Sequence, residues 1–292
     1  MSFLSMPKPQ DYTAWQASLV KNIDNAPLEH VFFWLIDPCA HPELPELIWQ
    51  LDPNPDAWPL YMNTYLEEAM NTGPFMLLYK KNSGLTGWLW REMWAAPLCC
   101  LVEAKKTQAN ELFQHFQNLL ECKNPQGKSS IFRFYDPRLL YGISTYQDAD
   151  VTRRILGPSL HMMGWEPGRQ VPVHLGLGTD MGFRSEGLES YDEAFFEHLW
   201  DENRVHATIG TLGHKTGMKL RAMPLAEAYK LVEEVQRILW QYHYTDRYSL
   251  AYGSSVTARL GLAVWDRPDL RETLATRPMN APLAEIMESL DI

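Results

Sequence analysis

The stretch Ser130-Ile-Phe-Arg-Phe-Tyr-Asp-Pro-Arg-Leu-Leu-Tyr141 joins a predicted strand to a predicted helix, and the fold is most readily inferred from it. From Ile131 to Tyr135 it is β-branched or aromatic apart from Arg133, a composition typical of strands. Pro137 has no N–H to contribute to a ladder, so the strand must end before it. Asp136 is then placed to cap a following helix, with Pro137 at the first helical position. The sequence therefore predicts a strand-to-helix corner that carries the charged side chains of Arg133, Asp136 and Arg138.

This corner has two interpretations. In the structural one, Asp136 caps the helix and pairs with an arginine. In the functional one, the charges form a polar site at the carboxyl end of a strand, where open α/β sheets bind ligands. The functional interpretation corresponds to an enzyme of unknown class that binds a small anionic molecule through Arg133, Asp136 and Arg138. The stretch alone does not decide between them.

The composition is that of a folded, acidic protein. The chain has 292 residues, 46% of them hydrophobic, and a formal net charge of −10. Such a charge argues against a nucleic-acid-binding protein, which needs a basic surface, and against docking on anionic lipid. No run approaches the ~18 apolar residues of a membrane span, and residues 1–10 lack the apolar core of a signal peptide. The four cysteines follow no disulfide or metal pattern. We therefore expect a cytoplasmic protein without membrane insertion.

Strand-like and helix-like segments alternate in the first half of the chain. Continuous apolar runs predict strands buried on both faces, at His30–Ile36, Phe75–Tyr79 and Pro97–Val102. Helical periodicity is present between and after these runs, at Leu44–Leu51, Leu85–Trp94 and Thr107–Glu121. This alternation predicts an α/β lobe over residues 1–146, with a mixed or mainly parallel sheet flanked by helices.

The second half has a different composition. Residues 147–188 are rich in Gly and Pro towards their end and predict a connecting segment with a single strand at Val171–Leu175. Residues 189–292 predict a mostly α-helical C-terminal lobe. In its first helix, the predicted inward residues are Phe195, Phe196 and Leu199. Residues 203–221 are weakly patterned and predict a mobile loop, and Pro224 opens the most regular amphipathic helix of the chain.

The helix predicted at Leu85–Trp94 carries three tryptophans that do not share one face. At 100° per residue, Trp88 lies about opposite Trp90 and Trp94. A helix that is apolar on nearly all sides is buried on several sides or awaits a partner. We favour burial, and the second alternative makes Trp88, Trp90 and Trp94 candidate partner-binding residues.

Common catalytic and metal-binding motifs are missing from the sequence. The stretch Gly176–Gly182 lacks the G-x-G-x-x-G spacing of a dinucleotide loop, and there is no phosphate-binding loop or H-E-x-x-H motif. His206 and His214 have no carboxylate pair near them in sequence, and Gly253-Ser-Ser is not a nucleophile elbow. We therefore expect no catalytic residue, no metal site and no cofactor, and a protein that is not an enzyme.

The corner string Phe132-Arg-Phe-Tyr-Asp-Pro-Arg-Leu-Leu140 resembles the signature of the adaptor–chaperones of bacterial type VI secretion. Members of that family show F-R-F/Y-Y-D-P-R-V-L at the same strand-to-helix corner. Further similarities occur in the expected order, at Leu35–Asp37, Leu44–Leu47, Pro59–Tyr61, Gly73–Leu77 and Leu156–Pro158. The resemblance covers roughly residues 31–158. One departure is Cys39-Ala-His41, where small or Gly-rich residues are expected.

The resemblance implies a role that the residues alone do not show. Proteins of this family bind the N-terminal region of an effector toxin in the bacterial cytoplasm, keep it soluble and promote its loading onto the VgrG spike. They are adaptors without a cofactor, and their second lobe is variable, which suits partner specificity. The resemblance also implies a structural role for the family-signature residues, which here are Arg133, Phe134, Tyr135, Asp136, Pro137, Arg138 and Leu139.

Overall fold

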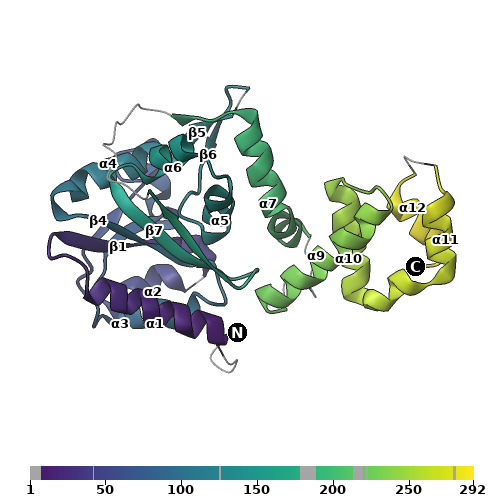
Figure 1. Ribbon diagram of the computed structural model, residues 1–292, viewed down its shortest axis with the longest axis horizontal. Coiled ribbons are helices and arrows are strands. Elements are labelled where there is room, and N and C mark those ends of the chain that lie inside the picture. Colours follow the sequence, from purple (N-terminus) through teal and green to yellow (C-terminus); the bar gives the residue numbers. More distant parts are fainter. Residues whose placement is uncertain are drawn as a thin grey trace. The chain divides into compact units, whose positions relative to one another are not determined.

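The computed structural model describes residues 8–41, 43–124, 126–177, 189–212, 220, 223–278 and 281–292. The chain forms two compact units, Met1–Glu202 and Asn203–Ile292 (Figure 1). The division falls inside helix α7, Glu193–Thr211. Among the described residues, no helix is both long enough and apolar enough to cross a membrane.

The first unit is built on a six-stranded sheet with the order β2-β3-β1-β4-β7-β8. Every neighbouring pair in this sheet is antiparallel. The strands are β1 (His30–Ile36), β2 (Ala57–Pro59), β3 (Phe75–Leu78), β4 (Cys99–Lys105), β7 (Ser159–Glu166) and β8 (Val171–Gly176). Strands β7 and β8 lie within residues 147–188, so the expected connecting segment extends the sheet by two strands.

The prediction of a mixed or mainly parallel sheet is wrong, since the sheet is antiparallel throughout. Helices nevertheless cover both of its faces. On one face lie α1 (Gln10–Asp24), α2 (Leu44–Leu51) and α3 (Gly84–Glu92) (Figure 1). On the other lie α4 (Ala109–Leu119), α5 (Pro137–Thr145) and α6 (Ala149–Leu156). A strand that is covered on both faces is apolar throughout. Its apolar run therefore does not reveal whether its neighbours are parallel or antiparallel.

Side chains that alternate along the strands fill two separate cores. Trp34 and Leu101 point to the α1–α3 side, where the hydroxyl of Tyr12 donates a hydrogen bond to the carbonyl of Trp90 at 2.6 Å. Phe33 and Val102 point to the α4–α6 side. Short 3₁₀ helices connect these elements, at Pro38–Ala40 (η2), Glu67–Thr72 (η3) and Lys106–Gln108 (η4).

A three-stranded sheet leads into the strand-to-helix corner. Its order is β6-β5-β9, with β6 at Ser129–Ile131, β5 at Glu121–Lys123 and β9 at Glu189–Ser190. Strand β6 ends at Ile131, so the predicted strand through Tyr135 is too long. The chain turns instead, with the Asp136 amide donating to the Arg133 carbonyl at 2.9 Å. Phe134 and Tyr135 are consecutive and both buried in the same core, which a strand with alternating side chains does not allow.

The second unit is helical. It contains the end of α7, then α9 (Leu225–Gln241), α10 (Arg247–Leu260), η5 (Leu262–Asp266), α11 (Pro268–Thr276) and α12 (Leu283–Ser289). The predicted apolar stripe of α9 is buried at Ala228, Val232, Val235 and Leu239.

The loop predicted over residues 203–221 is wrong as far as residue 211, which ends helix α7. Val205, Ile209 and Leu212 are spaced by four and three residues and are buried, an apolar repeat that favours a helix. Residues 213–219 and 221–222, including His214, lie outside the described residues.

Candidate functional site

Asp136 caps helix α5, as the sequence predicts. Its backbone is extended, with φ −75° and ψ 121°, and Pro137 occupies the first turn. The carboxylate Oδ1 accepts the backbone N–H of Arg138 at 2.9 Å. Leu140 and Ile143 then point into the core on the α4–α6 side of the sheet. The cap therefore fixes the point at which the chain leaves the turn and enters the helix.

The same carboxylate forms a two-nitrogen ion pair with Arg138. Nε of Arg138 lies 2.9 Å from Oδ1, and Nη2 lies 2.5 Å from Oδ2. Asp136 is only 5% exposed. Burial raises the pKa of Asp136, but Arg138 and Arg133 together outweigh it and hold that pKa below its usual value. Asp136 is consequently ionised at neutral pH.

A second carboxylate joins the corner from the end of strand β1. Asp37 is buried, and its Oδ1 accepts the N–H of Cys39 at 3.0 Å, which caps η2. Its Oδ2 pairs with the Arg133 guanidinium. Burial raises the pKa of Asp37, an effect that Arg133 partly offsets. The corner thus contains four charged side chains in the order Asp37, Arg133, Asp136 and Arg138. The first of them was not predicted from sequence.

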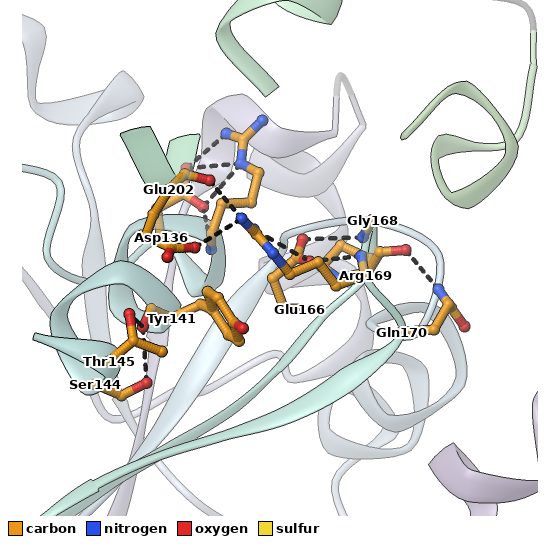
Figure 2. Close-up of polar contacts among 11 residues, drawn as sticks. Asp136, Tyr141, Ser144, Thr145, Glu166, Gly168, Arg169, Gln170 and Glu202 are labelled. Carbon is orange, nitrogen blue, oxygen red and sulfur yellow. Dashed lines mark hydrogen bonds and ion pairs between the residues drawn. The ribbon is translucent and has the colours of Figure 1, made fainter. Parts of the chain in front are cut away.

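The turn between β7 and β8 adds a third buried carboxylate, that of Glu166 (Figure 2). Glu166 is fully buried and accepts the N–H of Gly168 at 2.9 Å. The Arg169 guanidinium lies over the Tyr141 ring, 4.3 Å from its centroid, and donates to Glu202 Oε2 at 3.0 Å. These contacts tie the β7–β8 turn to α5 and to the part of α7 that belongs to the first unit. Neither Glu166 nor Arg169 was predicted as a site residue, because Pro167-Gly168 indicates only a turn.

This arrangement is a structural brace, meaning a set of ion pairs and hydrogen bonds that hold neighbouring loops and helix ends together. Asp136 uses both of its oxygens for the helix cap and the ion pair. The signature aromatics Phe134 and Tyr135 are buried, Pro137 is buried in the first turn of α5, and Leu139 packs against the same core. In the described part of the chain, no three His, Cys, Asp or Glu side chains are grouped so as to hold a metal ion.

The three candidate tryptophans lie on or just beyond helix α3. Trp90 is 6% exposed and Trp94 8%, and both belong to the core on the α1–α3 side. Trp88 is half-buried, with its ring centroid 5.7 Å from that of His41. Partner binding through these tryptophans stays a prediction, and Trp88 is the most accessible of the three.

Two other stretches considered in the sequence are placed in part. Gly176 ends strand β8, and residues 178–182 of the glycine-rich stretch lie outside the described residues. His206 is buried in α7, with its ring centroid 4.9 Å from that of Tyr229.

Residues 32–154 match a family model described as Domain of unknown function (DUF4123). The matched segment begins in β1, ends in α6, and includes Asp37 and the whole corner from Arg133 to Arg138. The chain therefore contains a DUF4123 domain. Strands β7 and β8 and the helical unit lie beyond the match. No curated protein and no solved structure matches the chain.

Proposed function

We propose that this chain is a non-enzymatic adaptor–chaperone of bacterial type VI secretion. It binds the N-terminal region of an effector toxin in the cytoplasm, keeps that toxin soluble and promotes its loading onto the VgrG spike. The observation that carries the proposal is the DUF4123 match over residues 32–154, because the corner resembling the adaptor signature lies inside it.

The geometry of the corner supports an adaptor rather than an enzyme. Asp136 pairs with Arg138 and caps the start of α5. Asp37 caps η2 and pairs with Arg133. Bonds of this kind stabilise a scaffold and leave no carboxylate in the corner for proton transfer. The net charge of −10 also suits a protein partner better than nucleic acid.

The presence of a separate helical unit supports the binding of two different partners by two parts of the chain. The DUF4123 match ends at residue 154, and the unit Asn203–Ile292 lies wholly outside it. A shared domain joined to a separate unit suits one common partner, here VgrG, and one specific partner, here the toxin.

The proposal is tested by producing the chain together with the toxin encoded by a neighbouring gene. We expect a stable complex on size-exclusion chromatography and a toxin that stays soluble only when the chain is present. A toxin that is equally soluble alone and elutes apart from the chain would contradict the proposal.

A further inference from the structure

Helix α7 has one face that is held firmly by the first unit. Phe195 and Leu199 are buried in the core on the α4–α6 side. The ring Nε2 of His198 donates to the carbonyl of Gly142 at 2.9 Å, and Glu202 bonds Arg169. These residues are spaced by three and four and share one side of the helix. The first half of α7 is therefore held in place through this one side of the helix.

The opposite side of α7 lines a surface groove of about 680 Å³. The groove residues of the helix follow the i, i+3, i+4, i+7, i+8 spacing of a single face, at Glu193, Phe196, Glu197, Trp200 and Asp201. The turn between β5 and β6 supplies the other wall with Asn124 and Gln126. Figure 1 shows α7 beginning beside this hairpin. Phe196, predicted to point inward, is half-buried: it packs against the core on the α4–α6 side and also lines the groove.

Packing of the core does not explain the residue types on this side of α7. A solvent-facing helix stripe is normally polar, yet the Trp200 side chain is 48% exposed. Carboxylates lie on both sides of it along the helix, and within the described part of the chain Glu193 and Glu197 have no ion-pair partner. An exposed indole among carboxylates is complementary to a cation on an apolar stem, because the ring face attracts cations and the carboxylates pair with them.

We infer that this groove binds a basic segment of a partner protein in which Lys or Arg alternates with apolar side chains. The charged heads pair with Glu193 and Glu197, and their stems and apolar neighbours pack on Phe196 and Trp200. The amides of Asn124 and Gln126 suit the polar backbone of the bound segment. The inference deepens the proposed function, on which it rests, by assigning the segment to the effector. Like-charge repulsion excludes nucleic acid from the same face.

The inference is tested first with a defined probe, a helical peptide of Lys and Leu, against a counterpart in which Glu replaces every Lys. Calorimetric titration of the full chain is expected to show binding of the basic peptide that weakens with added salt, and none of the acidic one. Trp200→Ser and Glu197→Lys are each expected to weaken binding at least about tenfold. Circular dichroism melting checks that both variants remain folded.

Two matched variants separate the groove from general attraction to an acidic protein. Trp49→Ser removes a tryptophan on α2 that is 53% exposed, and Glu227→Lys reverses an exposed carboxylate on α9. Both are expected to bind the basic peptide like the wild type. Equal weakening in all four variants, or none in Trp200→Ser and Glu197→Lys, would overturn the inference.

The same variants are then combined with the effector, so that the two proposals fail separately. If the wild type binds the effector and Trp200→Ser and Glu197→Lys bind it equally well, the groove is not the effector site, although the adaptor role stands. If the wild type binds no effector, the adaptor role fails, and the assignment of the effector to the groove fails with it. The peptide titration then still decides whether the groove recognises basic segments.

Discussion

The carboxylate of Asp136 bonds both the backbone N–H and the guanidinium of Arg138. Oδ1 accepts the Arg138 N–H at 2.9 Å, and Oδ2 lies 2.5 Å from Nη2 of the same residue. The helix cap and the ion pair are therefore one structural unit at the start of α5. Because Asp136 is buried, water cannot supply the hydrogen bonds of this unit when the carboxylate is removed.

Asp136→Ala is expected to destabilise the fold more than the loss of a helix cap does. A lost cap costs about 1 kcal/mol, and an arginine left without its partner in a buried site raises the cost to about 3–5 kcal/mol. The control is Asp148→Ala, because Asp148 caps α6 through Asp150 and Val151 at an exposed site. Urea unfolding measures both, and equal losses would show that the Arg138 pair adds nothing.

Arg169→Ala is expected to lower the free energy of unfolding by about 3 kcal/mol or more. The change removes the ion pair with the fully buried Glu166 and the contact with Tyr141. Arg153→Ala is the matched change at an exposed pair with Asp150 and should cost under about 1 kcal/mol. Similar unfolding midpoints for the two variants would argue against the proposed brace between α5, the β7–β8 turn and α7.

Stability is expected to fall with acid because of His115. Burial lowers the pKa of His115 from 6.5 to about 4, and its Nε2 donates to the Ile155 carbonyl at 3.1 Å. Below pH 6.5 the unfolded chain takes up a proton that the folded His115 does not. The unfolding free energy therefore drops by about 3 kcal/mol between pH 6.5 and 4 on account of this residue.

His115→Gln keeps a hydrogen-bond donor without this titration. The measurement is the difference in unfolding free energy between wild type and variant at several pH values from 7 to 4. The difference should shift in favour of the variant as the pH falls. A difference that stays constant over this range would mean that His115 is not the residue responsible.

Gly157→Ala is expected to destabilise the first unit by more than about 2 kcal/mol. Gly157 has φ +56°, and an added Cβ would lie 2.2 Å from Cδ2 of His115. Gly87 provides the control, because it is inside α3 and an added Cβ meets nothing within 4 Å. Gly87→Ala should stabilise the chain by about 0.5–1 kcal/mol. Thermal melting that ranks Gly157→Ala above Gly87→Ala would contradict this account.

The corner could be predicted from sequence because its constraints are local. A proline ends a strand, and an aspartate just before it caps a helix, whatever surrounds them. The partner of Arg133 could not be predicted in this way. Asp37 lies 96 residues earlier in the chain, and only the folded sheet brings the two together. Asp136 and Arg138 were accordingly predicted from sequence, whereas Asp37 and Glu166 were not.

The sheet shows the same limit at a larger scale. The apolar runs at β1, β3 and β4 correctly predicted buried strands, but burial on both faces carries no information on strand direction. Strand β7 was missed because its sequence, Ser-Leu-His-Met-Met-Gly-Trp-Glu, is not β-branched and contains a glycine. The groove on α7 was not predicted because Phe195 and Phe196 read as one apolar pair, although only Phe195 is fully buried and Phe196 also lines the groove.

The proposed role of the chain is to load an effector onto the VgrG spike. The most direct measurement is the amount of effector that co-purifies with VgrG, at equal effector concentration, with and without this chain. We expect effector on VgrG only when the chain is present, and a marked loss with Asp136→Ala because the DUF4123 domain is destabilised. Equal amounts of effector on VgrG in the presence and absence of the chain would contradict the account.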